Sequence, residues 1–365
     1  MARRTIIHID LDYFYAQCEE NANPSIRGKP VIVCVFSGRT PVSGVVSTSN
    51  YAARKYGVKA GIPIARAKKL LEGTDSIFLP MNRPFYESVS ERIMSILEES
   101  CDIFEKTGID EAYLDVTASS TGNFENTKNI ALNIKQLIFR QEHITSSIGI
   151  APNKLMAKIA SNHVKPDGLT TVYPDNAQTF LMGQQISIIP GVGKKVEEKL
   201  NQLQVKTIDE LARIDPILLQ KEFGKSLGVH LFQAARGEDE EKVQGRNLPT
   251  QISRIGTLKE NTKDVEQISP LLTDLTQNVA EKLQETHLTC NSVSIIAILD
   301  DLSIHTKSQT LDAPTNDPKT LTNVSSELLN QFLNSSDANL RRIGIKVSEL
   351  SNESGQLSME SFFRT

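Results

Sequence analysis

Two short acidic motifs lie far apart in the sequence. One is H-I-D-L-D at 8–12 and the other is I-D-E at 109–111, and each borders an apolar run that predicts a β-strand. If the strands pair, Asp10, Asp110 and Glu111 converge, with no Lys or Arg adjacent in either motif. Carboxylates that repel one another are tolerated mainly when a divalent cation lies among them. Two cations held in this way catalyse nucleotidyl transfer.

A simpler interpretation is that these aspartates only cap neighbouring backbone at strand ends. The consecutive pair Asp110 and Glu111, together with a second motif, favours the metal site. Asp12 and Asp115 alternate with the expected ligands, and we interpret them as structural groups instead.

Residues 47–55 combine small hydroxyl side chains with an aromatic hydroxyl and a cation. Thr48, Tyr51 and Arg54 are spaced by three, which predicts that they line one face of a helix. Such donors suit a triphosphate, and Lys165 in the V-K-P-D-G loop is a similar candidate. A capped surface helix and a solvated loop lysine explain these residues equally well when each is taken alone.

The segment I-I-P-G-V-G-K-K at 188–195 predicts a helix-hairpin-helix. Gly191 and Gly193 would let backbone N–H groups approach a DNA phosphate closely, beside Lys194. The alternative, a nucleotide-binding glycine loop, lacks both the preceding strand and the GxGxxG spacing.

The C-terminal residues 356–363 read Q-L-S-M-E-S-F-F. Their anchors, Gln356, Met359, Phe362 and Phe363, fall on one side of a short helical turn and predict a docking peptide. The pattern is similar to the peptide that docks on the archaeal and eukaryotic sliding clamp. The alternative is a tail that folds back on its own domain.

The chain has 365 residues, a net charge of -4 and four cysteines without a CxxC pair. We expect a soluble, cytoplasmic, multidomain protein with reduced thiols, no signal peptide and no membrane span. The acidic balance argues mildly against a nucleic-acid ligand, but the motifs outweigh it.

The element pattern changes along the chain. Strands expected at 5–11, 31–36, 103–105, 112–116 and 147–151 alternate with helices at 50–56, 64–71, 83–99, 126–141 and 153–162. Short helices follow from 186 to 236, and the charged stretch 237–245 predicts an exposed tether. Beyond it come strands at 252–259, 295–299, 304–311 and 343–348, with helices at 265–285 and 318–333.

Together these residues resemble the Y-family translesion DNA polymerases, specifically the DNA polymerase IV branch in its archaeal form. The similar segments span nearly the whole chain: 10–19, 28–38, 50–63, 109–115, 149–168, 189–193 and 340–345.

The resemblance implies a multidomain α+β fold shaped like a right hand. Its parts would be a mixed α/β palm at 1–11 and 80–170, small fingers at 12–79, and a helical thumb with a helix-hairpin-helix at 171–236. A linker at 237–250, an α+β little finger at 251–350 and a tail with the clamp peptide at 351–365 would follow.

The resemblance also implies roles for individual residues. Asp10, Asp110, Glu111 and the Leu11 carbonyl would hold two Mg²⁺, for which Mn²⁺ can substitute, and Tyr15 would be the steric gate against ribonucleotides. Thr48, Tyr51, Arg54 and Lys165 would grip the triphosphate, whereas Gly191, Gly193, Lys194, Arg341 and Arg342 would contact DNA.

The implied function is template-directed, low-fidelity DNA synthesis past damaged bases, by a monomer recruited by the sliding clamp. Small residues in the fingers imply a roomy pocket, and acidic residues in the little finger imply weak intrinsic DNA binding. Two departures from the family are the T-P-V loop at 40–42 and that acidity. The alternatives are a catalytically silent clamp-bound scaffold and a palm-type nucleotidyl cyclase.

Overall fold

The computed structural model describes residues 3–245, 248–335 and 337–352. The chain divides into two compact units, which are described separately. The first comprises Met1–Val35 and Val45–Arg246, and the second comprises Phe36–Gly44 and Asn247–Thr365.

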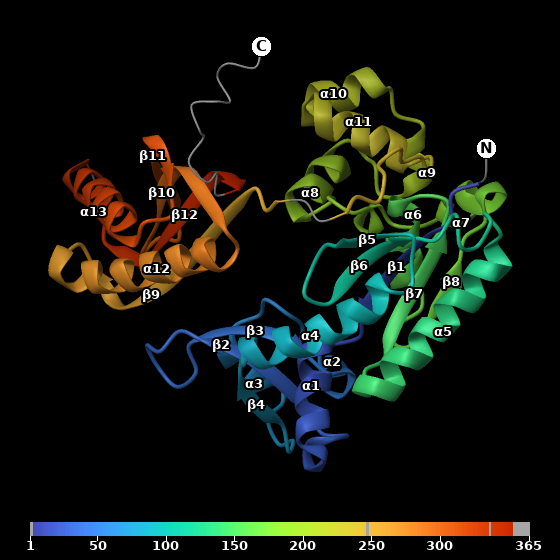
Figure 1. The fold of residues 1–365 in the computed structure, drawn as a ribbon, viewed down its shortest axis with the longest axis horizontal. Coiled ribbons are helices and arrows are strands. Elements are labelled where there is room, and N and C mark those ends of the chain that lie inside the picture. Colours follow the sequence, from blue (N-terminus) through green and yellow to red (C-terminus); the bar gives the residue numbers. More distant parts are fainter. Residues whose placement is uncertain (1–2, 246–247, 336, 353–365) are drawn as a thin grey trace, which may run out of the picture. The chain divides into compact units, whose positions relative to one another are not determined.

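A five-stranded sheet forms the centre of the first unit (Figure 1). Its order is β5 (Ile103–Lys106), β6 (Glu111–Asp115), β1 (Ile6–Leu11), β7 (Ser146–Ala151) and β8 (Leu169–Thr171). β1 is antiparallel to both of its neighbours. Because β1 and β7 are mostly apolar and almost every residue of both is buried, they take the middle of the sheet.

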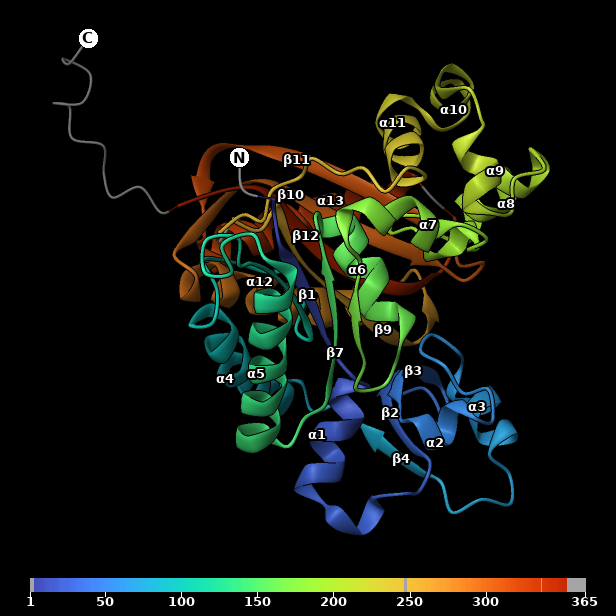
Figure 2. The ribbon, with the colours of Figure 1, turned by 90° about the vertical axis from the view of Figure 1, so that its right-hand side faces the viewer.

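Helices cover both faces of this sheet. α4 (Arg83–Glu98) and α5 (Phe124–Glu142) share one hydrophobic core with Ile7 and Ile9 of β1, whereas α6 (Lys154–His163) shares another with Ile6. Figure 2 shows α5 and α6 on opposite sides of β7. Asn153 caps the start of α6, since its side chain accepts a hydrogen bond from Met156 N.

A smaller layer follows β1 along the chain. α1 (Phe14–Ala22) leads through a short 3₁₀ turn (Pro24–Ile26) to a three-stranded sheet in the order β3 (Gly44–Ser49), β2 (Val31–Phe36) and β4 (Ile77–Pro80), with α2 (Tyr51–Arg54) and α3 (Ile64–Leu70). Ile32, Val46 and Ile64 belong to its separate small core. The sequence pattern did not predict β3, β4 or β8, of which β4 and β8 are short.

The last helices of the first unit are also short, as expected from the glycine punctuation. They are α7 (Ala177–Leu181), α8 (Lys194–Gln202), α9 (Ile208–Ala212), α10 (Pro216–Phe223) and α11 (Lys225–Ala234). α10 and α11 pack very closely at Gly228, where an added Cβ would lie 2.6 Å from the Gln220 backbone.

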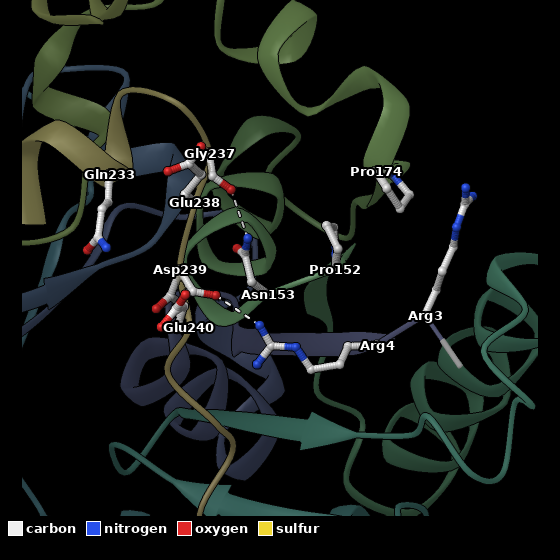
Figure 3. A pocket seen from close by; sticks show the side chains of 10 residues that line it. All are labelled: Arg3, Arg4, Pro152, Asn153, Pro174, Gln233, Gly237, Glu238, Asp239 and Glu240. Carbon is white, nitrogen blue, oxygen red and sulfur yellow. Dashed lines mark hydrogen bonds between the residues drawn. The ribbon is translucent and has the colours of Figure 1, made fainter. Parts of the chain in front are cut away.

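Most of the stretch 237–245 is exposed, as expected, but it is not a free tether, because several of its groups have fixed partners (Figure 3). Asn153 donates to the Gly237 carbonyl over 2.8 Å, and Arg4 donates to the Asp239 carbonyl over 2.9 Å. Val243 is only 4% exposed. The charged composition suggested a solvated segment, but several charges have fixed partners: Lys154 Nζ, for example, pairs with Glu241 at 2.6 Å.

The second unit contains a four-stranded antiparallel sheet. Its order is β11 (Ile304–Thr315), β10 (Leu288–Leu299), β12 (Leu340–Asn352) and β9 (Gln251–Thr262). The helices α12 (Val265–Glu285) and α13 (Pro318–Ser335) share one core with alternate residues of β10 and β12, such as Val293, Ile295 and Ile345. The expected α+β module is therefore present.

Candidate active site

The two acidic motifs are neighbours in the sheet. β1 and β6 pair so that Asp10 lies opposite Glu111, and Leu11 N donates to the Asp110 carbonyl over 2.8 Å. Because side chains alternate along a strand, Asp10 points to the same face as His8, two residues earlier. This is the face that α6 covers, since His8 Nδ1 lies 2.7 Å from Ser161 Oγ.

The negative charges influence one another. Burial and, after it, the neighbouring carboxylates Asp10 and Glu111 together raise the pKa of Asp110 to about 6. The His8 imidazole and the Lys158 ammonium instead lower the pKa of Glu111 to about 2. A proton or a cation would therefore stabilise the Asp110 carboxyl, whereas the Glu111 carboxyl is firmly ionised.

Two lysines that are remote in sequence neutralise part of this charge. Lys165 Nζ lies 2.6 Å from Asp10 Oδ1, and Lys158 Nζ lies 2.6 Å from Glu111 Oε2. Lys158 and His8 were missed by the sequence analysis. Nothing in the acidic motifs pointed to Lys158, because it arrives from α6, 47 residues after Glu111.

The carboxylates beside these lysines are suitable ligands for a divalent cation. Within the described part of the chain, no three His, Cys, Asp or Glu side chains stand together as a ready-made metal cluster. The available donors are nevertheless carboxylate oxygens on adjacent strand ends, which is the chemistry that hard divalent cations prefer. The raised pKa of Asp110 indicates negative charge that a cation would relieve. The residues present therefore fit a divalent-cation site.

Tyr15 projects from the start of α1, directly after the acidic strand. The turn is made by Tyr13, whose φ of 36° lies in the left-handed region. Burial raises the pKa of Tyr15, as does the nearby charge of Asp110. The Tyr15 ring stacks on Tyr86 with 4.5 Å between centroids, and Tyr86 donates to Glu19 Oε1 over 2.6 Å. The aromatic side chain expected as a gate is therefore held close to Asp110.

The expectation that Thr48, Tyr51 and Arg54 share one helical face is wrong for Thr48. The Asn50 side chain accepts from Ala53 N, so α2 begins only at Tyr51, and Thr48 lies in β3. Tyr51 and Arg54 do share a face of α2, with the Arg54 guanidinium 4.8 Å from the centroid of the Tyr51 ring.

The residues expected to contact DNA lie in both units. Gly191 has a φ of 92°, and Gly193 precedes α8, which begins at Lys194. Arg341 and Arg342 lie in β12 of the second unit. The four expected clamp anchors, Gln356, Met359, Phe362 and Phe363, lie outside the described residues.

Three family models match the chain. The impB/mucB/samB family model matches 9–162, its C-terminal domain matches 249–359, and the model described as DNA polymerase-iota, thumb domain matches 187–239. DNA polymerase IV of Nitrosopumilus maritimus is 44% identical over 100% of both chains. The chain belongs to the Y family of DNA polymerases. DNA polymerase IV of Methanosarcina acetivorans is 42% identical, over 98% of this chain and 99% of the relative.

Solved Y-family structures share the fold. A Y-family chimera of Dbh and Dpo4 has a TM-score of 0.88 at 38% identity, covering 95% of this chain and 99% of the chimera. An insertion ternary complex of Dbh DNA polymerase has a TM-score of 0.70 at 38% identity, with the same coverage.

These similarities confirm the expected family, the right-hand fold with its thumb and little finger, and the enzyme class. The protein is a DNA-directed DNA polymerase of the translesion type. The relatives reported above are polymerases and not nucleotidyl cyclases. Among the described residues, no helix combines the length and apolar composition needed to cross a bilayer.

Proposed function

We propose that this polymerase joins deoxynucleotides to a primer by two-metal nucleotidyl transfer at Asp10, Asp110 and Glu111. The observation that carries the proposal is the pairing of Asp10 with Glu111 on adjacent strands, beside an Asp110 whose pKa is raised to about 6. Two Mg²⁺, or Mn²⁺ in their place, would be held by these carboxylates and by the Leu11 carbonyl. When bound, they would lower the pKa of the primer 3′-hydroxyl and neutralise the leaving pyrophosphate.

The surrounding cations have separate tasks in this proposal. Lys165, now 2.6 Å from Asp10, exchanges that carboxylate for the incoming triphosphate, which Arg54 and Tyr51 also bind. Thr48 contributes a hydroxyl from β3 instead of from α2. Lys158 keeps Glu111 ionised and oriented through its 2.6 Å contact.

Tyr15 is proposed to select the sugar. Its ring cannot retreat easily, because Tyr86 behind it is fully buried and is hydrogen-bonded to Glu19. A ribose 2′-hydroxyl would meet a fixed aromatic surface, so ribonucleotides would be excluded by a clash.

The DNA and partner contacts complete the proposal. Primer–template DNA would lie against the backbone N–H groups at Gly191 and Gly193 with Lys194, and against Arg341 and Arg342, without sequence readout. The 356–363 peptide would recruit a sliding clamp to a monomeric, cytoplasmic enzyme. Burial raises the pKa of Cys18 to about 12, which favours reduced structural thiols. A roomy pocket would permit low-fidelity synthesis past damaged bases.

The decisive experiment is primer extension with Mg²⁺ and single nucleotides, comparing the wild type with Asp110→Ala and Tyr15→Ala. We expect the first substitution to abolish extension and the second to admit ribonucleotides. Asp115→Asn is the matched control, because Asp115 ends β6 and its side chain accepts a local bond from Thr117 N. Extension by Asp110→Ala at the wild-type rate would refute the proposed metal site.

A further inference from the structure

Asp12 is a buried carboxylate that the proposed mechanism does not use. It is 1% exposed and accepts three hydrogen bonds. Thr145 Oγ1 donates to Oδ2 over 3.0 Å, Ser147 Oγ donates to Oδ1 over 2.7 Å, and Asp167 N donates to Oδ2 over 2.8 Å. All three donors are neutral, so the charge is stabilised by hydrogen bonds.

The three donors connect two parts of the sheet edge. Thr145 and Ser147 flank the first residue of β7, whereas Asp167 belongs to the loop at 164–168 that carries Lys165. Ser147 Oγ also accepts from Gly168 N over 3.3 Å. The Asp12 carboxylate therefore ties that loop to the central strands.

The loop has little freedom to adopt another path. An added Cβ at Gly168 would lie 1.9 Å from the Val164 carbonyl oxygen, so the loop packs against itself. From outside, Lys135 of α5 lies 2.8 Å from the Asp167 carboxylate. Removing the Asp12 carboxylate would leave the Asp167 N–H without its acceptor and release the loop on its inner side.

We propose that Asp12 is a positioning residue that sets the reach of Lys165 toward the nucleotide triphosphate. Asp12 follows Asp10 by two residues, so one strand end provides both the present partner of Lys165 and the anchor of its loop. The chain from the anchored Asp167 to Lys165 is only two residues long. The inference rests on the proposed role of Lys165 and adds to it the group that fixes its position.

A double-mutant cycle tests whether Asp12 acts through Lys165. The variants are Asp12→Ala, Lys165→Ala and the double substitution, each assayed by single-turnover primer extension for kpol and for nucleotide Kd. Because a charge-assisted contact is lost, we expect Lys165→Ala to raise the Kd for dNTP about ten- to a hundredfold. Asp12→Ala should raise it by a similar factor, and the double variant should be no worse than Lys165→Ala alone. The Kd for primer–template should not change.

Two further variants keep the test decisive. Asp12→Asn retains the shape and one carbonyl acceptor for Asp167 N, so it should recover most of the nucleotide affinity even if Asp12→Ala folds poorly. Asp115→Asn changes a carboxylate at the end of another strand, where it accepts from Thr117 N, and should leave the Kd unchanged.

The outcomes separate the inference from the proposed function. Multiplying effects in the double variant, or a loss in kpol and thermal stability at unchanged nucleotide Kd, would show that Asp12 has only a structural role. An unchanged Kd for Lys165→Ala would overturn both the triphosphate role of Lys165 and the inference that depends on it. Loss of extension in Asp110→Ala would still support the metal site in either case.

Discussion

Asp110→Asn should stabilise the metal-free protein while it destroys the polymerase. The pKa of Asp110 stands at about 6 instead of its usual 3.8, because the group is buried and faces Asp10 and Glu111. Folding at neutral pH therefore forces a charge into a place that disfavours it. An amide of the same shape removes that cost.

The expected size follows from the pKa. At 1.36 kcal/mol per pKa unit the difference would be about 3 kcal/mol, and screening by solvent at this partly exposed site reduces it to about 1–2 kcal/mol. For a folding unit of this size, that corresponds to an increase of about 2–6 °C in Tm.

The pKa of Asp110 also determines how the stability difference between the variant and the wild type depends on pH. The folded-state pKa is raised, so the contribution of Asp110 to stability is fully present below about 3.8 and is lost as the pH rises through about 6. The Tm advantage of Asp110→Asn should therefore be absent near pH 4 and complete above pH 7.

The assay is thermal unfolding in the presence of a chelator across this pH range, with Asp115→Asn as the control. Adding Mg²⁺ should raise the Tm of the wild type more than that of Asp110→Asn, because only the wild type keeps the full set of carboxylates. An Asp110→Asn variant that is less stable than the wild type at pH 7.5 would refute the argument. A Tm advantage of the variant that is as large at pH 4 as at pH 7.5 would also refute it.

Two further outcomes are expected. Lys158→Met should lower the free energy of unfolding by about 1 kcal/mol at pH 7, measured as a lower Tm. Lys158 helps to hold the pKa of Glu111 at about 2, so this stabilisation is present above the usual pKa of Glu and is lost as the pH falls toward 2. The difference in Tm between the variant and the wild type should therefore be smaller at pH 4. Gly228→Ala should destabilise the packing of α10 against α11 by about 1–3 kcal/mol and so lower the Tm, because its Cβ would meet the Gln220 backbone at 2.6 Å. Gly193→Ala, with nothing within 4 Å, is the matched control for thermal unfolding.

The sequence predicted those features that local pattern determines. The apolar run at β1 and the amphipathic patterns of α4 and α12 identified several of the long elements. β3 was missed because its residues read G-V-V-S-T-S, in which hydroxyl side chains suggested a phosphate site instead of a strand. For this reason the sequence pattern placed Thr48 on a helix face, whereas it lies in a strand.

The electrostatic partners could not be predicted in the same way. The motif at 109–111 contains no cation, but the alternation of β1 and its cover by α6 bring Lys158 to Glu111. The acidic stretch after Gly237 is held by Arg4 and Lys154, which are distant in sequence. Such pairs arise from tertiary packing, and a one-dimensional charge pattern cannot distinguish them from solvated residues.

The lysine pairs explain how this site remains stable without its ligands. Lys165 can neutralise Asp10 or bind a triphosphate, but its single ammonium cannot do both at 2.6 Å. Its charge beside Asp10 limits the repulsion among the carboxylates, which otherwise raises the pKa of Asp110. In the proposed mechanism, an arriving nucleotide would draw Lys165 away and free the Asp10 carboxylate at the same moment. The full negative charge that the proposed metal site needs would then be available only when the substrate is present. The hydrogen bond from Asp167 N to Asp12 would keep the Lys165 loop close enough for this exchange.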